Sequence, residues 1–306
     1  MGSEVTRIQA ARGGTRRRPL PVAVRSALLG LCLAFPGAAA GADTRTAEGQ
    51  YRFAEGLFAR RFYDLAEKEF RSFVENHAAS PLAPDAMYRL IICLRNQDRK
   101  DGMFDAINDF QARWPDHALG VKLNLWRGEL LFERGQYPAA EACFRRLTGH
   151  SESAVQEAAT FFMGQSQEKQ GKAEAAIETY RALAEKDLDG VHEYRPYALF
   201  AVALADQRQQ RHEAATAAFA RLAEGERVPA GLRQEAAYRL AESHFAQEDY
   251  NRAAAGYEGL LATFPEGPFA QEARKRLSWA YYLRGDYSQA AEAAAAWRQK
   301  YGEVFD

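Results

Sequence analysis

Apolar positions recur along this chain with the spacing of a helix face, and one three-position pattern returns seven times. Each copy has a small residue, a large aromatic residue four positions later and an apolar residue three positions after that. Residues at i, i+4 and i+7 share one face of an α-helix, so each copy predicts an amphipathic helix. The clear copies are Ala66/Phe70/Phe73, Ala140/Phe144/Leu147, Ala176/Tyr180/Leu183, Ala215/Phe219/Leu222 and Ala253/Tyr257/Leu260, and the weaker ones are Met103/Ile107/Phe110 and Ala290/Ala294/Trp297. Successive copies begin 36 to 39 residues apart, and seven such units account for nearly all of residues 43–306.

A second helix is predicted upstream of each copy, because apolar residues there also keep a helical spacing. The predicted segments are 51–60, 86–95, 123–132, 158–167, 197–206, 235–245 and 273–283. Gly135, Gly171 and Gly285 fall between paired helices, where a residue that accepts a left-handed conformation is useful. Proline and glycine mark the linkers, and no segment alternates with the period of a strand. The pattern predicts an all-α protein of helix pairs.

The paired unit resembles the tetratricopeptide repeat. The third unit matches the family pattern through Gly128, Gly135, Tyr137, Ala140 and Phe144, and the fourth through Gly164, Gly171, Ala176 and Tyr180. The family repeat has about 34 residues, and the extra residues of this chain lie in its linkers. The resemblance implies a right-handed α-solenoid of about seven helix-turn-helix units. One pair cannot bury its apolar face alone, so stacked neighbours must supply the core.

The first 42 residues predict a secretory signal peptide that is cleaved from a mature chain of residues 43–306. Six arginines precede an uncharged apolar stretch, residues 26–35, and a run of small residues follows it. The stretch is too short for a transmembrane anchor. The signal type, general secretory or twin-arginine, and the true translation start stay open. Lipidation of Cys32 is disfavoured because bulky Leu31 precedes it.

Charge and cysteine content narrow the partners of the mature chain. The whole chain has 40 basic and 41 acidic residues, and removing residues 1–42 leaves 34 against 40. A net charge of −6 argues against nucleic acid and against adhesion to anionic lipid. Cys93 and Cys143 lie on separate predicted helices among apolar neighbours. We expect two buried free thiols rather than a disulfide.

Candidate catalytic motifs are incomplete. His212-Glu213 begins like a zinc-binding H-E-x-x-H motif, but Thr216 stands where the second histidine belongs. The six histidines are scattered singly, and the glycines near Lys172 have the wrong spacing for a phosphate loop. We therefore expect no catalytic residue, no metal site and no cofactor, and we expect the protein not to be an enzyme.

The resemblance also implies a binding surface, since the first helix of each pair lines the concave face in the family. Its fifth, ninth and twelfth positions often touch the ligand. Carried over, these positions give a set we call the first-helix row: Tyr51, Tyr88, Phe161, Phe200, Tyr238, Trp279, Phe58, Phe132, Phe245 and Tyr282. Aromatic rings with a polar rim suit protein binding. The alternative is that these rings pack between neighbouring first helices.

The favoured function is a periplasmic scaffold that binds other envelope proteins or peptides. The chain resembles the repeat lipoprotein of the outer-membrane barrel assembly machinery and the periplasmic repeat protein linked to the Tol-Pal system and cell division. It lacks a convincing lipid-anchor cysteine for the first and an N-terminal coiled coil for the second. The resemblance therefore predicts a role in an envelope process, either outer-membrane assembly or cell division. We also expect no stable transmembrane anchor.

Two alternatives accompany this interpretation. A groove that binds or processes peptidoglycan or another carbohydrate would need convergent carboxylates, and Glu129 and Glu168 on adjacent units are the nearest candidates. The last predicted helix, residues 288–301, carries Trp297 and no further helix follows to cover it. Solenoid ends need a cap, so that helix favours contact with a partner or a homodimer through the C-terminal helix.

Overall fold

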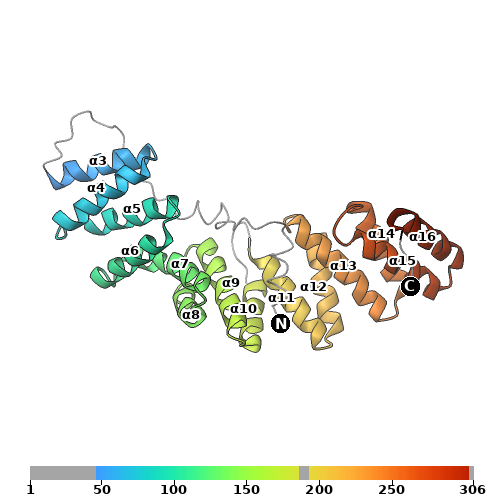
Figure 1. Cartoon of the computed structure of the whole chain (residues 1–306). Helices are drawn as coiled ribbons and strands as arrows, with labels where there is room; N and C mark the ends of the chain where they lie inside the picture. Colours follow the sequence, from blue (N-terminus) through green and yellow to red (C-terminus); the bar gives the residue numbers. More distant parts are fainter. Residues whose placement is uncertain (1–45, 186–192, 303–306) are drawn as a thin grey trace. The chain divides into compact units, whose positions relative to one another are not determined.

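The computed structural model describes residues 46–185 and 193–302, which contain fourteen α-helices and no strand (Figure 1). The helices form seven consecutive pairs: α3 (Ala47–Ala59) with α4 (Tyr63–Asn76), α5 (Ala83–Asn96) with α6 (Lys100–Arg113), α7 (Ala118–Glu133) with α8 (Tyr137–Arg145), α9 (Ser153–Lys169) with α10 (Ala173–Glu185), α11 (Arg195–Arg208) with α12 (His212–Glu224), α13 (Ala230–Ala246) with α14 (Tyr250–Thr263), and α15 (Ala270–Arg284) with α16 (Tyr287–Tyr301). The predicted signal peptide lies outside the described residues. Across the described ranges, no helix is both long and apolar enough to cross a bilayer.

Packing follows the order of the chain. From α3 to α9, and again from α11 to α16, each helix packs on the next, and the first helices α7 and α9, like α11 and α13, also touch. The described helices fall into two compact units, one ending at Ala176 and the other beginning at Ile177. Each predicted first helix lies within an observed helix to within one residue, and the observed helices begin two to five residues earlier than predicted. The predicted fold class, an all-α solenoid of about seven helix-turn-helix units, is confirmed.

The repeated triad forms the core. All seven first residues of the triad are buried, from Ala66 to Ala290, and so are all seven third residues. At the middle position the large residues are buried in six pairs, whereas Ala294 of the last pair is half-exposed. A small residue at the first position lets two helices approach, and the larger residue fills the space beside it. The last pair therefore lacks the ring that fills this space in most other pairs.

The turn within each pair uses one left-handed residue, always five positions before the triad begins. Glycine holds this position in three pairs, with φ of 75°, 77° and 93° at Gly135, Gly171 and Gly285. These are the glycines for which the sequence predicts this role. The other four pairs have Arg61, Asp98, Gln210 and Glu248 there, with φ between 55° and 63°. L-residues disfavour this region, so these four turns carry local strain.

Replacing Gln210 by glycine is expected to raise the free energy of unfolding by about 1 kcal/mol. The side chain is exposed, so its removal costs no packing. Urea denaturation would measure the gain. The control is Gln209→Gly at the preceding residue, where φ is −87° and glycine relieves nothing. Equal effects at both positions would contradict a conformational cause.

Two buried carboxylates fasten one pair to the next. Glu67 on α4 accepts hydrogen bonds from Gln97 at 3.0 Å and Arg99 at 2.6 Å, both in the turn after α5. Glu141 on α8 accepts from Gln170 at 2.8 Å and Lys172 at 3.2 Å, in the turn after α9. Both glutamates follow the first residue of a triad. At these two junctions, charge-assisted hydrogen bonds join neighbouring pairs at the edge of the apolar core.

Cys93 and Cys143 are free and buried, as predicted. Burial raises the pKa of both thiols, and that of Cys93 reaches about 12. Both thiols therefore stay protonated at neutral pH and behave as small core residues.

Candidate functional site

The first-helix row divides into three groups by exposure. Tyr88, Phe161 and Phe200 are buried, at 9%, 2% and 0% exposed. Five further rings are half-buried: Tyr51, Phe58, Phe132, Tyr238 and Phe245. Trp279 and Tyr282 on α15 are exposed, at 37% and 53%. The three buried rings expose little or no surface to a ligand, so they serve packing, and the proposed binding surface consists of the other seven residues of the row.

The buried rings contact other aromatic residues of the core. Phe200 meets Phe219 edge-on with ring centroids 5.7 Å apart, and Tyr88 stacks on Trp126 of the next pair at 5.9 Å. Such pairs contribute about 0.5–1.5 kcal/mol beyond the area they bury. The alternative interpretation, packing between neighbouring first helices, describes Tyr88, whereas Phe200 packs on the second helix of its own pair.

The half-buried rings at the twelfth position share one local contact. Phe58, Phe132 and Phe245 each meet, edge-on, the tyrosine that begins the second helix of the same pair, at centroid distances of 5.7, 5.2 and 5.5 Å. Tyr282 repeats this contact with Tyr287 at 5.5 Å. The recurring tyrosine thus closes the turn of its pair, and Phe58, Phe132 and Phe245 each keep part of their surface accessible.

Arginines of the following pair reach back to this row. Arg89 pairs with Glu55 at 2.8 Å and its guanidinium lies 4.9 Å from the centre of the Phe58 ring. Arg276 makes the same two contacts, with Glu242 at 3.3 Å and with the Phe245 ring at 5.5 Å. Sequence reasoning missed these arginines, although both occupy the sixth position of their repeat, directly after the fifth position that contributes to the first-helix row.

Burial and nearby carboxylates keep two tyrosines of the row protonated. Burial, then the charge of Glu55, raises the pKa of Tyr51 to about 12. Burial, then the charges of Glu242 and Glu272, does the same for Tyr238. Both phenols are hydrogen-bond donors at every physiological pH. The row therefore offers aromatic faces, phenol donors and ion pairs, which suits a polypeptide ligand.

Glu129 and Glu168, the candidate carboxylates, lie on α7 and α9, the first helices of adjacent pairs, which touch. The Oε1 atom of Glu129 is buried without a hydrogen-bond partner among the described residues. Burial raises the pKa of Glu129 to about 8, opposed by the charge of Arg95 and assisted by that of Glu133.

The His212-Glu213 motif lacks the second histidine of a zinc site, because Thr216 stands in its place. His212 and Glu213 are exposed at the start of α12. No group of His, Cys, Asp and Glu in the described part of the chain is arranged to hold a metal ion.

Substituting Glu129 by glutamine is expected to stabilise the protein progressively between pH 5 and pH 9. The folded-state pKa lies above the ordinary value of 4.5, so stability that is full below pH 4.5 is lost as the pH rises towards 8. Glutamine keeps the shape without that loss, and we expect a gain of about 1–2 kcal/mol at pH 9. Thermal denaturation at both pH values measures it. A gain of equal size at pH 5 would show that the charge plays no part.

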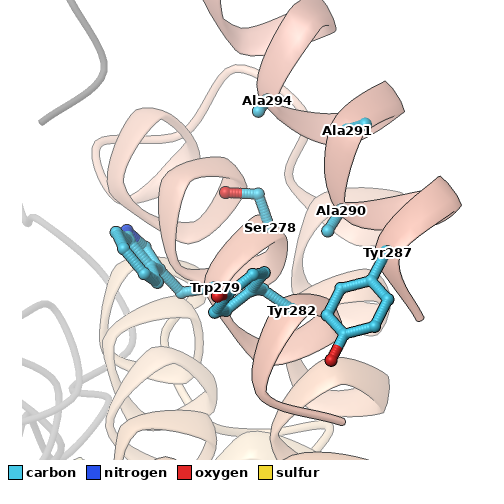
Figure 2. Close-up of a pocket in the computed structure, with 7 residues that line it drawn as sticks. All are labelled: Ser278, Trp279, Tyr282, Tyr287, Ala290, Ala291 and Ala294. Carbon is cyan, nitrogen blue, oxygen red and sulfur yellow. The ribbon is translucent and has the colours of Figure 1, made fainter. Parts of the chain in front are cut away.

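A second accessible surface lies on the last pair. Seven residues, which we call the end face, line a hollow of about 520 Å³ between α15 and α16: Ser278, Trp279, Tyr282, Tyr287, Ala290, Ala291 and Ala294 (Figure 2). The rings of Tyr282 and Tyr287 lie side by side at one end, and the alanines follow α16 away from them (Figure 2). The lining is mostly apolar and exposed, which is typical of a surface that meets a protein.

These features define the class of protein. Serial helix pairs with small residues at the helix crossings and a left-handed turn residue in each pair are those of a helical-repeat solenoid. More particularly, the chain contains tetratricopeptide repeats: the sequence model of that repeat matches residues 51–118 and 125–190. The model of an outer membrane lipoprotein family, YfiO, matches residues 231–304. Tetratricopeptide-repeat proteins are generally scaffolds rather than catalysts.

Solved structures agree on the fold. The C-terminal part of a repeat-containing protein from Cytophaga hutchinsonii aligns with a TM-score of 0.60 at 17% identity, over 83% of this chain and 96% of that one. PilF from Pseudomonas aeruginosa aligns with a TM-score of 0.50 at 15% identity, over 74% and 95%. At such identities the likeness concerns the fold alone. No curated protein matches the sequence.

Proposed function

We propose that this protein is a non-enzymatic scaffold that binds other proteins in the periplasm of a bacterium, in outer-membrane assembly or cell division. The observation that carries the proposal is the match of residues 231–304 to an outer membrane lipoprotein family. That segment spans α13 to α16 and contains four of the row residues that keep accessible surface, Tyr238, Phe245, Trp279 and Tyr282.

The surface chemistry supports a protein ligand. Phe245 is half-buried, and contacts with Tyr250 and Arg276 hold its ring in place. A pre-positioned ring loses little conformational entropy on binding. The acidic character of the mature chain and the sequence features of residues 1–42 support export and a non-nucleic-acid partner.

Site-specific photo-crosslinking in living cells tests the proposal. A photoreactive phenylalanine analogue replaces Phe245 in the row, and the control places it at Arg252 on the second helix of the same pair, where the side chain is 74% exposed. We expect discrete crosslinks to envelope proteins from Phe245 and none from Arg252. The same products from both positions, or none from either, would defeat the scaffold.

Two further measurements complete the test. Cell fractionation should recover the mature chain with periplasmic proteins, and recovery in the cytoplasm would rule out the proposed location. Retention of the purified protein on cell-wall sacculi, with no protein crosslink from Phe245, would favour the carbohydrate-binding alternative.

A further inference from the structure

Large exposed apolar side chains gather on the first and the last helix pair. On the first pair they are Phe53 (44%), Phe62 (50%) and Leu65 (45%); on the last they are Trp279 (37%), Tyr282 (53%), Leu283 (45%) and Tyr287 (66%). Among the described residues, Val121 is the one such side chain on an intermediate pair. Some of these positions are more buried in intermediate pairs: Leu240, in register with Phe53, and Phe245, in register with Tyr282, are both half-buried.

The chain itself shows how a first helix seats on the pair before it. Leu277 of α15 packs against a cluster that joins Ala241, Ala253 and Tyr257 of α13 and α14 to Ala273 and Ala280 of α15. In the same way Leu240 of α13 packs against a cluster built from α11, α12 and the first half of α13. One residue before Leu277, Arg276 reaches Glu242 and the Phe245 ring. In α13 and α15 the docking first helix thus has an apolar residue at the seventh position of the repeat and an arginine at the sixth.

The end face is the same receiving surface, one repeat later. A shift of 37 residues carries Ala241 to Ser278, Glu242 to Trp279, Phe245 to Tyr282, Ala253 to Ala290 and Tyr257 to Ala294. The side chains differ in size at two places: Trp279 stands in register with Glu242, and Ala294 stands in register with Tyr257, whose buried ring fills the preceding interface. Ala294 lines the hollow in Figure 2, so the missing ring contributes to that space. A side chain larger than leucine would fill more of it.

Helix α3 presents the matching face. Phe53 occupies the seventh position, in register with Leu240 and Leu277, and it is larger than both. Arg52 occupies the sixth position, in register with Arg89 and Arg276, and its side chain is 73% exposed in a 3.7 Å pair with Glu48. Such an exposed pair is weak, so the guanidinium is available to Trp279 and Tyr282, where a cation–π contact would replace the ion pair with Glu242.

We propose that copies of this protein associate head to tail, with α3 of one copy seated on the end face of the next. Phe53 fills the hollow over Ala294, and Arg52 lies against the rings of Trp279 and Tyr282. The contact repeats, between two copies, the interface that joins α14 to α15 within the chain. Within the chain the large side chain is Tyr257 of the receiving pair, whereas between copies it is Phe53 of the docking helix. The proposal does not depend on the envelope function proposed above.

A symmetric pairing, in which two end faces contact each other, would cover the same surface less well. It would oppose Ala290, Ala291 and Ala294 to their own copies and leave the hollow unfilled, at a cost in lost packing. A head-to-tail contact uses two different surfaces, so it does not stop at two copies.

Sedimentation velocity on the protein purified after expression of the full chain tests the inference. We expect assembly that grows with concentration. Phe53→Ser removes the inserted ring and Ala294→Phe fills its place, and each should weaken association at least about tenfold, the change expected for loss of one central contact. Val121→Ser, at an exposed position in α7, is the control and should associate like the parent.

Mixing the two blocked variants gives the sharpest result. The Phe53→Ser variant keeps its end face and the Ala294→Phe variant keeps its α3 face, so an equimolar mixture should form one-to-one dimers while each alone stays monomeric. A parent protein that remains monomeric at all concentrations would overturn the inference. So would association that Ala294→Phe blocks and Phe53→Ser does not, which would indicate the symmetric pairing, and so would a mixture that stays monomeric.

Since only purified protein is present, this outcome is independent of crosslinking to envelope partners. Crosslinks from Phe245 with a monomeric protein would support the scaffold and overturn the self-association. Assembly without such crosslinks would support the self-association and overturn the scaffold.

Discussion

Replacing Glu141 by alanine is expected to lower the free energy of unfolding by about 2–3 kcal/mol. The carboxylate is 4% exposed and accepts hydrogen bonds from Gln167, Gln170, Lys172 and Arg145. Hydrogen bonds to an ionised acceptor are stronger than neutral ones. Its removal also takes away one acceptor of the Gln167 amide, a side chain that is 7% exposed. The loss falls on the contact between α8 and the turn after α9.

The pH dependence separates this cause from loss of packing. Burial raises the pKa of Glu141, but the hydrogen bonds from Gln170, Gln167 and Lys172 outweigh it and hold the pKa below the ordinary 4.5. A lowered folded-state pKa means that the stabilisation is present above pH 4.5 and is lost as the pH falls through the folded value. Urea titrations of parent and variant should therefore converge on acidification.

The matched control is Glu75→Ala, which removes an exposed carboxylate from α4 of the same compact unit. We expect its effect to stay within about 0.5 kcal/mol. A Glu141→Ala loss no greater than that of the control, or one unchanged between pH 7 and pH 4, would show that the buried carboxylate does not join the two pairs.

Replacing Gly128 by leucine is expected to destabilise the protein by about 3 kcal/mol, at the upper end for overpacking. A Cβ atom at this position would lie 2.6 Å from the Phe144 ring, and the ring is fully buried. The better helix propensity of leucine offsets less than about 1 kcal/mol of this cost. Thermal and urea denaturation would both report the loss, while circular dichroism confirms that the helices persist.

The same kind of change should have the opposite sign on α3. An added Cβ at Gly56, in the interior of that helix, meets nothing within 4 Å. Gly56→Ala should therefore stabilise by about 0.5–1 kcal/mol through helix propensity alone. If Gly128→Ala were also stabilising, the close approach of α7 and the Phe144 ring would not be a constraint.

Periodicity made most of the fold predictable. The triads depend on local spacing, and three of the seven turn residues are glycines whose purpose can be read directly. Arg61, Asp98, Gln210 and Glu248 occupy the same turn position without any such signal, because their conformation is imposed by the packed helices on either side. Local sequence therefore identified the repeats while missing the strain within four of them.

The binding surface was less predictable, because exposure depends on the neighbouring pair. Phe200 and Tyr238 hold equivalent positions, yet one is fully buried and the other half-buried. Arg89 and Arg276 act across the junction between pairs, so their role appears only when two repeats are placed together. The substitution of alanine for an aromatic residue at position 294 was visible as a weak copy of the pattern, whereas the hollow to which it contributes was not.

Strictly serial packing has a consequence for how such a protein changes over generations. Where a helix rests on the helices next to it in the chain, duplication or loss of one whole pair leaves two compatible surfaces to meet again. Length can then drift by modules of 36 to 39 residues without redesign of a shared interior. A globular domain, whose interior is built from segments distant in sequence, has no comparable freedom.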